Sequence, residues 1–481
     1  MSFNIKQKYQ SLSQPVKASL WFAVCNAVQK GISLVSTPIF TRMLTPEQYG
    51  VYTVYQSWYA IISIIATLNL SYGVFNNGMS KYPEDRPRFV SSMQGLSITA
   101  TLIVSIVYFA GMNFWSRVLD MTPVLMIAML IELVAMPSYL YWSAEQRYNY
   151  RYRKLVVVTV IMAVASPLLG IAAVYFSEFK AEARIISYVA VQAVIGFAFM
   201  IYIFARKRTF FDKEYWKFGL RFNIPLIPHY LSTQILSQAD RIMIKKMVSD
   251  SKAAIYGVAN TVSMMMIIVT SAINNSFIPF TYKELKEHRY DSIRRTANFL
   301  LILVGGACIL AMAFCPEIIR IFAAPEYYEA IWVMPPIAAA VYFMFLYPLF
   351  ANIEFYFEKT GFVAVASSIA AFTNLVLNYI FINRYGYYAA GYTTLICYIV
   401  YSGAHYLFHL RVIRKNIPDV KQIYNMKFVL LMSVVVIGAM LLMLVLYRHM
   451  IIRYAVIAAL LLTAFLMRKR IMAGLKALKN K

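Results

Sequence analysis

Long apolar segments alternate with short clusters of charged residues along the whole chain. Each apolar segment is about twenty residues long, the length that an α-helix needs to cross the hydrocarbon core of a bilayer. The segments lie at 18–41, 49–72, 89–113, 121–143, 155–177, 185–204, 222–245, 254–280, 297–315, 330–353, 362–382, 389–408, 428–447 and 451–467. The pattern therefore predicts about fourteen transmembrane helices joined by short loops.

The composition is typical of a membrane protein and excludes an ordinary soluble one. Hydrophobic residues make up 60% of the 481 residues and charged residues only 14%, whereas soluble proteins carry about 45–50% apolar and about 25% charged residues. Fourteen spans with their loops use nearly the whole chain, which leaves no room for a separate soluble catalytic domain. The sequence shows no nucleophile motif and no metal-ligand spacing. We therefore expect no enzyme, no cofactor, and no catalytic or metal-binding residues.

The positive charge of the chain is distributed unevenly between the two sets of predicted loops. The 46 Lys and Arg residues exceed the 21 Asp and Glu residues by 25. If the N-terminus is cytoplasmic, 33 of the 46 basic residues fall in cytoplasmic loops and tails, and 11 fall in the opposite loops. Cytoplasmic loops of membrane proteins are enriched in Lys and Arg. We therefore expect both termini in the cytoplasm, and the basic character requires no nucleic-acid partner.

An internal repeat predicts two lobes. The first predicted helix ends with IFTRML at 39–44, and the seventh ends with IMIKKM at 242–247; Tyr-Gly-Val opens the helix that follows each of them. A duplication of six helices places such motifs at equivalent points of two parallel repeats. The predicted organisation is a six-helix lobe at 1–205, a basic cytoplasmic linker at 206–221, a second six-helix lobe at 222–410, and two extra helices with a basic cytoplasmic tail at 411–481.

The predicted fold is thus an all-α polytopic membrane protein with two six-helix lobes, related by a pseudo-twofold repeat, and two C-terminal helices.

The linker (RKRTFFDKEYWKFGLR) mixes basic and aromatic residues. It is either an amphipathic segment that lies on an anionic leaflet and acts as a hinge between the lobes, or an ordinary basic loop. The four cysteines, Cys25, Cys308, Cys315 and Cys397, lie in apolar runs without the paired spacing of a metal site or of a disulfide framework, so we expect them to be small core residues.

Polar side chains recur at helical spacing in several predicted spans. They are Asn26, Lys30, Ser33 and Thr37 in the first, His229, Thr233, Ser237, Asp240 and Arg241 in the seventh, and Asn260 and Asn274 in the eighth. Residues three or four positions apart lie on the same face of a helix. Each polar face either lines a hydrophilic cavity or makes hydrogen bonds between helices, which contribute about 0.6 kcal/mol each in membranes.

Five ionisable residues within the spans are the main candidates for function. Charged side chains at membrane depth cost about 2.5–3.5 kcal/mol on insertion scales. No acidic residue lies three or four positions from Lys30, so we expect this cation to face a cavity. Asp240 and Arg241 are adjacent and point about 100° apart, so they do not simply neutralise each other. Glu132 is either a proton-coupling site or a protonated side chain bonded to another helix, and His229 is either a proton relay or structural.

The ordered motifs resemble those of a known family. Residues 31–33 read GIS, residues 37–50 read TPIFTRMLTPEQYG, and residues 224–229 read IPLIPH before Asp240 and Arg241. The pattern is similar to bacterial oligosaccharide flippases of the O-antigen type, within the multidrug/oligosaccharidyl-lipid/polysaccharide exporter superfamily. The resemblance covers most of the chain, including the number of spans, the two lobes and the short loops.

This resemblance implies translocation of an undecaprenyl-diphosphate-linked oligosaccharide, an O-antigen or other surface-polysaccharide repeat unit, across the bacterial inner membrane by alternating access. Membrane lipids and other polysaccharide-assembly membrane proteins are the expected partners. A diphosphate-linked sugar needs cations and hydrogen-bonding groups, and the expected substrate-binding residues are Lys30, Asn26, Ser33, Thr37, Arg241, Thr233, Ser237, Asn260 and Asn274. The expected ion-coupling residues are Glu132, Asp240 and His229.

Two other functions remain open. A proton- or sodium-coupled multidrug extruder of the same superfamily would bind organic cations, for which carboxylates in the early helices are the natural ligands. Between residues 18 and 72 the sole acid is Glu47, in a loop, so the sequence favours an anionic substrate. A polytopic polysaccharide polymerase or ligase would usually carry a large extracytoplasmic loop, whereas the corresponding segments of this sequence are all short.

Overall fold

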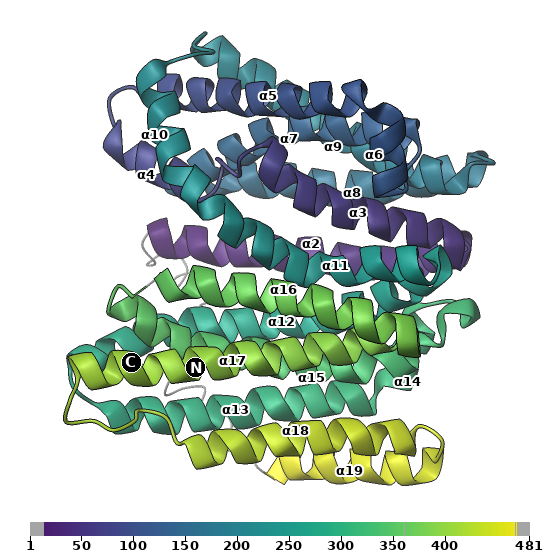
Figure 1. Ribbon diagram of the computed structural model, residues 1–481, viewed down its shortest axis with the longest axis vertical. Coiled ribbons are helices and arrows are strands. Elements are labelled where there is room, and N and C mark those ends of the chain that lie inside the picture. Colours follow the sequence, from purple (N-terminus) through teal and green to yellow (C-terminus); the bar gives the residue numbers. More distant parts are fainter. Residues whose placement is uncertain (1–13, 360, 467, 469–481) are drawn as a thin grey trace, which may run out of the picture. The chain divides into compact units, whose positions relative to one another are not determined.

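The computed structural model describes residues 14–359, 361–466 and 468, and these residues form helices almost throughout (Figure 1). The described part of the chain contains no β-strand. By the contacts of its backbone, the chain divides into two compact units, Met1–Gln234 and Ile235–Lys481. Within each unit the long helices lie side by side, parallel or antiparallel to their neighbours (Figure 1).

Each of the fourteen predicted spans corresponds to one long helix, so the predicted all-α polytopic fold is confirmed. The first six are α2 (Gln14–Met43), α3 (Pro46–Ala66), α5 (Arg86–Ala110), α7 (Pro123–Tyr148), α8 (Tyr152–Phe176) and α9 (Lys180–Arg206). The next six are α11 (Ile227–Met247), α12 (Asp250–Lys286), α13 (Tyr290–Ala313), α15 (Ala330–Tyr356), α16 (Gly361–Tyr385) and α17 (Ala389–Asn416). The last two are α18 (Met426–Leu446) and α19 (Met450–Leu466). The division between the two units falls within α11, so the predicted linker at 206–221 lies in the first unit.

Nine of these helices, among the described residues, are long and apolar enough by themselves to cross a membrane. Of the other five, α19 has only 17 residues. In α2, α3, α11 and α17, polar and tyrosine residues dilute the apolar sequence. A helix whose polar groups are covered by neighbouring helices can carry such residues across a bilayer, and each of these four helices contributes residues to the candidate site.

Several helices begin where their sequence provides a cap. At α3, the side chain of Thr45 accepts a hydrogen bond from the backbone N–H of Gln48, and the side chain of Gln48 accepts one from the backbone N–H of Thr45. Pro46 occupies the first helical position, where its missing N–H costs nothing. Ser249 caps α12 in a similar way. These caps satisfy N–H groups that the first turn of a helix leaves without backbone partners.

The structure also contains short helices that the sequence pattern did not predict: α4 (Gly73–Lys81), α6 (Met112–Leu119), α10 (Lys213–Asn223) and α14 (Cys315–Phe322), with the 3-10 turns η1 (Ile224–Leu226) and η2 (Pro325–Tyr327). The predicted end of the second span at residue 72 is wrong, because α3 ends at Ala66 and the chain turns through Leu68 and Asn69, which both have positive φ. In contrast, α12, which contains the equivalent Tyr-Gly-Val motif at 256–258, is one unbroken helix of 37 residues.

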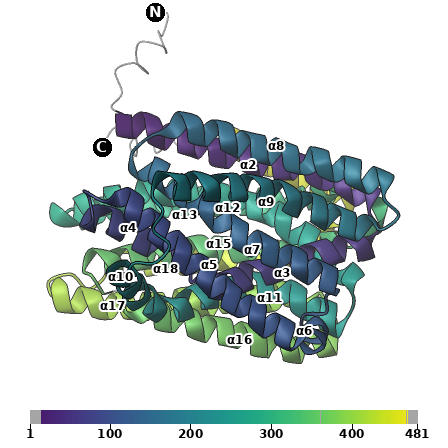
Figure 2. The same cartoon turned by 90° about the horizontal axis from the view of Figure 1, so that it is seen from above.

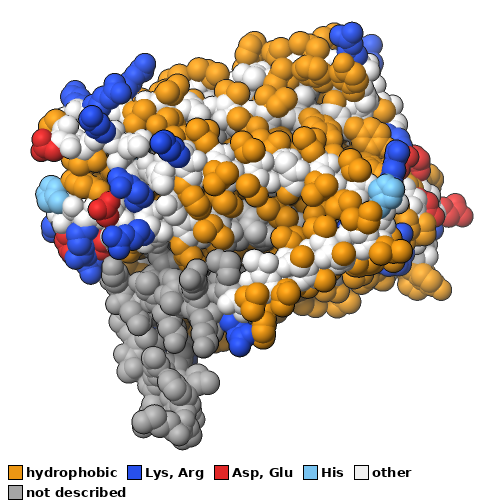
Figure 3. All heavy atoms as spheres, turned by 90° about the horizontal axis from the view of Figure 1, so that it is seen from below, with side chains coloured by type: hydrophobic (Ala, Val, Ile, Leu, Met, Phe, Trp, Pro, Cys, Tyr) orange, Lys and Arg blue, Asp and Glu red, His pale blue; other side chains and the backbone are white. Residues whose placement is uncertain are grey.

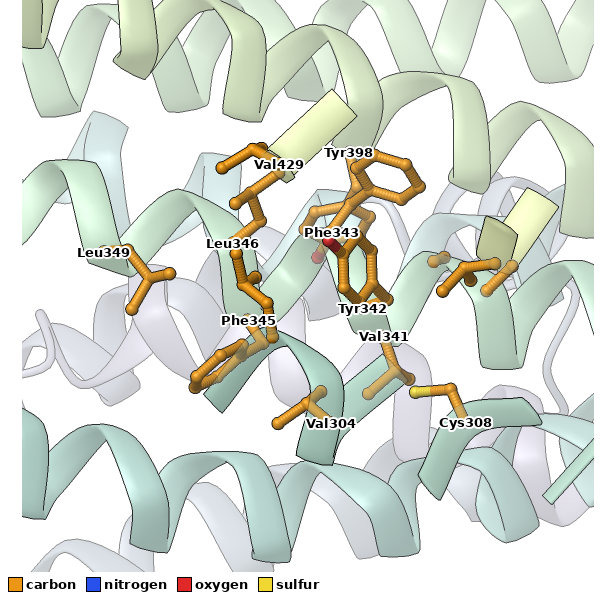
Figure 4. Packing of buried hydrophobic residues seen from close by; sticks show 14 of the residues in the cluster. Val304, Cys308, Val341, Tyr342, Phe343, Phe345, Leu346, Leu349, Tyr398 and Val429 are labelled. Atoms are coloured by element: carbon orange, nitrogen blue, oxygen red, sulfur yellow. The ribbon is translucent and has the colours of Figure 1, made fainter. Parts of the chain in front are cut away.

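The second unit has a hydrophobic core centred on α15 (Figure 4). Tyr342 and Leu346 of α15 pack with Cys308 of α13, Tyr398 of α17 and Val429 of α18, and all five side chains are buried. All four cysteines of the chain are buried and free, which confirms their prediction as core residues.

The outer surface of the molecule is apolar where a bilayer would contact it. Figure 3 shows hydrophobic side chains over the middle of one face, with Lys and Arg toward its ends. On α18, for example, Leu430, Leu431 and Val434 are each more than half exposed. Soluble proteins rarely expose apolar patches of this size. This surface is therefore suited to contact with lipid.

The predicted linker forms a turn followed by α10. Asp212 caps this helix by accepting hydrogen bonds from the backbone N–H groups of Glu214 and Tyr215. The aromatic face of α10 packs on α4 and α5, with Tyr215 only 7% exposed. Lys213 and Lys217 lie exposed on the helix. The segment is therefore amphipathic, and its apolar side is covered by the first unit itself.

Candidate functional site

A buried carboxylate lies in the first unit. Glu132 of α7 is 1% exposed, and the hydroxyl of Tyr55 on α3 donates a hydrogen bond to its Oε2 atom at 3.1 Å. Tyr59 of α3 and Tyr188 of α9 lie within electrostatic range of the carboxylate. No Lys, Arg or His among the described residues forms an ion pair with Glu132, so its direct polar partner is a tyrosine hydroxyl.

Arg184 of α9 is a buried cation in the same unit. Its side chain is 5% exposed, and its guanidinium lies 3.9 Å from the ring centre of Phe40 and 4.5 Å from that of Tyr52. Its Nη2 atom donates to the hydroxyl of Tyr52 at 3.3 Å, while Nε and Nη1 have no hydrogen-bond partner within the described part of the chain. The ring of Tyr52 contacts that of Tyr188 edge-on, at 6.5 Å between centres. Arg184 and Glu132 therefore belong to one cluster of tyrosines that joins α3, α7 and α9.

The predicted sixth span begins at residue 185, which puts Arg184 in the loop before it. That placement is wrong, since α9 begins at Lys180 and buries Arg184 in its second turn. Two aromatic faces hold the guanidinium by cation–π attraction, which is worth about 2 kcal/mol when the pair is desolvated. The available signal was the tyrosine-rich sequence of α3, which supplies one of those faces.

A group of six connected polar side chains in the second unit includes Asp240. We call this group the Asp240 cluster; it comprises Asp240 of α11, Tyr256 of α12, Asn374 and Asn378 of α16, and Thr393 and Thr394 of α17. Every member is at most 6% exposed. Four helices thus place one carboxylate, two amides and three hydroxyls together inside the bundle.

Three of these groups donate hydrogen bonds to the carboxylate of Asp240. Nδ2 of Asn378 lies 2.6 Å from Oδ1, and the hydroxyl of Thr394 lies 2.7 Å from Oδ2. The hydroxyl of Tyr256 also donates to Oδ2. The amide groups are linked in turn, because Nδ2 of Asn378 donates to Oδ1 of Asn374 at 3.2 Å. Carboxylate, amide and hydroxyl oxygens are the ligands that hard cations prefer, and the same carboxylate can also carry a proton.

The second unit also contains a buried pair of ionisable residues, which the sequence pattern did not predict. Nδ1 of His405 on α17 lies 3.0 Å from Oε2 of Glu354 on α15, and both side chains are fully buried. Tyr401 and Tyr347 pack against the imidazole, with ring centres at 4.8 and 5.6 Å. His409, one turn further along α17, is 1% exposed. The predicted tenth span ended at residue 353, one position before Glu354, so its carboxylate was not considered. The i, i+4 spacing of the two histidines was the signal available in the sequence.

The predicted polar face of the first span is described only in part. The side chains of Asn26 and Lys30 lie outside the described residues. Ser33 is exposed, and Thr37 is 5% exposed and donates its hydroxyl to the backbone carbonyl of Ser33 at 2.9 Å. Within α2, therefore, the hydroxyl of Thr37 is satisfied by its own helix.

The remaining predicted residues of α11 are spread over both units. His229 is half-buried, and Thr233 is exposed and donates to the carbonyl of Tyr230 at 2.8 Å. These two residues belong to the first unit. Ser237 and Arg241 belong to the second unit, where both are half-buried and Nη1 of Arg241 donates to the side-chain oxygen of Gln238 at 3.2 Å.

The two predicted asparagines of α12 occupy different environments. Asn260 is buried, at 6% exposure. Asn274 is half-buried, and its side-chain oxygen accepts a hydrogen bond from Nδ2 of the buried Asn352 on α15 at 3.0 Å. No contact recorded for the described residues joins either asparagine to Asp240. The structure thus brings Asp240 together with residues of α16 and α17 that the sequence did not single out.

Comparison with protein families identifies the chain's relatives. The family described as "Polysaccharide biosynthesis protein" matches residues 16–283, and the family described as "MatE" matches residues 225–380. A protein described as "Lsg locus putative protein 1" from Haemophilus influenzae is 23% identical over 369 residues, which cover 74% of this chain and 88% of that protein. The first of these matches spans more than half of the chain and confirms the family that the sequence motifs resembled.

Solved structures share the fold. The lipid II flippase MurJ, in an inward closed conformation, has a TM-score of 0.67 and 14% identity, with coverage of 94% of this chain and all of that one. An inward-facing multidrug resistance transporter of the MATE family and the MOP superfamily has a TM-score of 0.61 and 13% identity, with coverage of 81% of this chain and 96% of that one. At such low identity the likeness establishes the fold.

Proposed function

Because the chain belongs to the polysaccharide biosynthesis protein family, we propose that it is a flippase rather than an enzyme. It moves an undecaprenyl-diphosphate-linked oligosaccharide, an O-antigen or other surface-polysaccharide repeat unit, across the bacterial inner membrane. The family match over residues 16–283 is the observation that carries this proposal. The fold agrees with it, since fourteen long helices account for most of the described residues.

The chemistry of such a substrate explains why membrane helices would carry polar side chains. A lipid-linked diphosphate brings negative charge, sugar hydroxyls and a long polyprenyl tail, so its carrier needs cations and hydrogen-bonding groups, while the tail can stay in lipid. Lys30 and Arg241 would attract the diphosphate. The amides and hydroxyls of Asn26, Ser33, Thr37, Thr233, Ser237, Asn260 and Asn274 would bind sugars. We propose that the headgroup crosses by alternating access of the two halves of the chain.

Ion coupling is assigned to the buried carboxylates. Placing a carboxylate inside a bilayer costs a few kcal/mol. A carboxylate that is present despite this cost is a candidate for binding a proton or another ion during transport. Asp240 is the strongest candidate, because its buried carboxylate accepts hydrogen bonds from two hydroxyls, those of Tyr256 and Thr394, and from the amide of Asn378. Glu132, with a tyrosine hydroxyl as its direct partner, is the candidate in the first unit. His229 is a further candidate for proton transfer.

Deletion of the gene followed by analysis of lipid-linked intermediates tests the proposal. We expect an undecaprenyl-diphosphate-linked repeat unit to accumulate in the cytoplasmic leaflet and surface polysaccharide to be lost, with both restored by the wild-type chain. Surface display that persists with no accumulated intermediate would contradict the proposal. The assigned location is the inner membrane, with both termini in the cytoplasm and with other polysaccharide-assembly membrane proteins as partners.

A multidrug extruder is the second candidate, since the MatE family also matches part of the chain. The same deletion strain distinguishes the two functions. An extruder would leave lipid-linked intermediates at their normal level and would make the deleted strain more sensitive to cationic drugs, whereas a flippase would change the intermediates and leave drug sensitivity unaltered.

A further inference from the structure

A groove of about 960 Å³ lies in the first unit, at the end where α2 and α8 begin and α7 and α9 end. We call it the basic groove. Its described lining residues are Gln14, Lys17, Trp142, Gln146, Tyr150, Arg151, Tyr152, Arg153, Lys154, Val157, Val158, Phe199 and Tyr202. The positive-inside pattern assigns this end to the cytoplasmic side. None of the residues expected to bind the transported substrate or to couple ions lines it.

The basic groove is lined by basic residues and, among its described walls, by no acidic one. Lys17, Arg151, Arg153 and Lys154 line it, and its thirteen described lining residues include no Asp or Glu. A pocket of about 820 Å³ in the second unit is different, although it also contains several basic residues. Acidic side chains line that pocket, and Arg294 pairs with Asp291 at 2.9 Å. The basic groove is therefore specifically suited to an anion.

The first turn of α8 adds to the positive potential of the groove. Its N-cap residue, Arg151, makes no capping hydrogen bond with its side chain, and the first turn contains no acidic residue. The N-terminus of a helix carries a partial positive charge and N–H groups that lack backbone partners. Arg153 and Lys154 place two further positive charges in that same turn, where a cation is destabilising. An anion in the groove would offset this repulsion.

Apart from Gln14 and Gln146, the other described lining residues of the groove are aromatic or apolar. The rings of Trp142 and Phe199 stack at 4.2 Å between centres. Beside the groove, Trp21 of α2 stacks on the lining residue Tyr152 of α8, at 6.0 Å, and the two helices run side by side (Figure 2). Aromatic residues of this kind are typical of the interface between lipid headgroups and acyl chains.

An exposed apolar stripe on α8 leads from the groove toward the middle of the bilayer. Val157 lines the groove and is 56% exposed, and Ile161 and Leu168 are 54% and 61% exposed. Their spacing of four and seven residues puts them on one face of the helix. From Val157 to Leu168 this face rises about 16 Å, close to the thickness of one leaflet of a hydrocarbon core of about 30 Å. The stripe fits an acyl chain whose headgroup lies in the groove.

We propose that the basic groove binds the headgroup of an anionic phospholipid of the cytoplasmic leaflet, with one acyl chain along the exposed stripe of α8. The four basic side chains and the N-terminus of α8 hold the phosphate, and Val157, Ile161 and Leu168 contact the chain. A soluble phosphate would use only the first part of this site. The inference is independent of the transported substrate, since it concerns a resident lipid of the surrounding membrane.

Binding of tail-labelled phosphatidylglycerol to the purified full-length chain in an uncharged detergent tests the proposal. We expect saturable binding, measured by fluorescence anisotropy, that labelled phosphatidylcholine does not reproduce. The double variant Arg153→Gln/Lys154→Gln should weaken binding about thirty-fold, since each basic residue near an anionic lipid surface contributes about 1 kcal/mol. The variant Arg153→Lys/Lys154→Arg keeps both charges and should bind like the wild type, which separates loss of charge from misfolding.

The matched control is Lys213→Gln/Lys217→Gln, which removes two exposed basic residues from α10. This control should change the dissociation constant less than two-fold, and an equal loss in both charge-removing variants would overturn the proposal. The variant Ile161→Gln/Leu168→Gln should weaken phosphatidylglycerol binding because it disrupts the acyl-chain contact.

Two competition outcomes would also overturn the assignment. If inorganic phosphate displaces phosphatidylglycerol at equal concentration, the groove binds a soluble anion and not a lipid. If undecaprenyl diphosphate displaces it at far lower concentration, the groove belongs to the transported substrate. Failure of both competitors supports a resident anionic phospholipid.

Discussion

The strength of the hydrogen bond from Thr394 to Asp240 reports whether the carboxylate of Asp240 is ionised. The hydroxyl of Thr394 donates to Oδ2 of Asp240 at 2.7 Å, and both side chains are at most 5% exposed. Valine has nearly the same shape as threonine, so Thr394→Val removes this donor and, besides it, the acceptor of a long hydrogen bond of 3.5 Å from Nδ2 of Asn374. A hydrogen bond to a charged group contributes about 1.5–3 kcal/mol, whereas a neutral one between membrane helices averages about 0.6 kcal/mol. These two magnitudes are far enough apart to be distinguished.

We expect Thr394→Val and Asp240→Asn to couple by about 1–2.5 kcal/mol in a double-mutant cycle, which is the strength of a charged hydrogen bond less that of the neutral one that remains after Asp240→Asn. The reason is that three donors, from Tyr256, Asn378 and Thr394, converge on the carboxylate, the arrangement that an ionised carboxylate, an acceptor only, can satisfy. The free energy of unfolding of the wild type, the two single variants and the double variant would be measured in detergent at neutral pH.

Ser402→Ala is the matched control for this cycle. Ser402 is a buried residue of α17 whose hydroxyl donates to the carbonyl of Ile399, in its own helix, at 3.0 Å. It should show no coupling to Asp240→Asn. A coupling near zero between Thr394 and Asp240 would refute the reasoning, because the bond would then be worth no more than a neutral one.

Four further predictions follow from other parts of the chain. Lys30→Ala should abolish surface-polysaccharide display while the protein stays in the membrane, and normal display would remove Lys30 from the substrate site. Glu132→Gln should impair proton-dependent transport in proteoliposomes, and unchanged coupling would leave Glu132 a structural residue. Gly196→Ala should destabilise the protein by about 1–3 kcal/mol in thermal unfolding, because a Cβ there would lie 2.5 Å from the backbone of α7; wild-type stability would show that α7 and α9 can separate freely. The hydrogen bond from Lys252 lowers the pKa of the Glu329 carboxyl below its ordinary value of 4.5, so this half-exposed pair contributes up to about 1 kcal/mol of stability above that pH, which is lost as the pH falls through the lowered pKa. The difference in melting temperature between wild type and Glu329→Gln should therefore shrink on acidification, and a pH-independent difference would contradict the assignment.

The sequence predicted the helices well and the polar contacts poorly, and the reason lies in the range of the interactions. A transmembrane helix is a local property of about twenty consecutive residues, so all fourteen were found. The partners of Asp240 are separated from it by 138 residues in the case of Asn378 and by 154 in the case of Thr394. No local spacing relates such residues, and only the packing of α11 against α16 and α17 brings them together.

Errors of a few residues at helix ends had consequences for the candidate site. The tenth span was predicted to end one residue before Glu354, and the sixth was predicted to begin one residue after Arg184. Hydropathy falls off at both points because each residue is charged, yet each is buried, Glu354 by pairing with His405 and Arg184 between two aromatic rings. A charged residue at the edge of an apolar run is thus as strong a candidate for function as one in the middle.

The internal repeat explains the shared plan of the two halves but not their buried carboxylates. If IFTRML at 39–44 is matched to IMIKKM at 242–247, Thr37 of α2 occupies the position of Asp240 of α11. Both side chains are buried, but Thr37 bonds to its own helix through Ser33, whereas Asp240 is bonded by three residues of other helices. The first unit instead has its carboxylate on α7, at Glu132. The buried acids therefore occupy non-equivalent positions in the two halves, and a substitution at Asp240 has no counterpart at the equivalent position of the first unit.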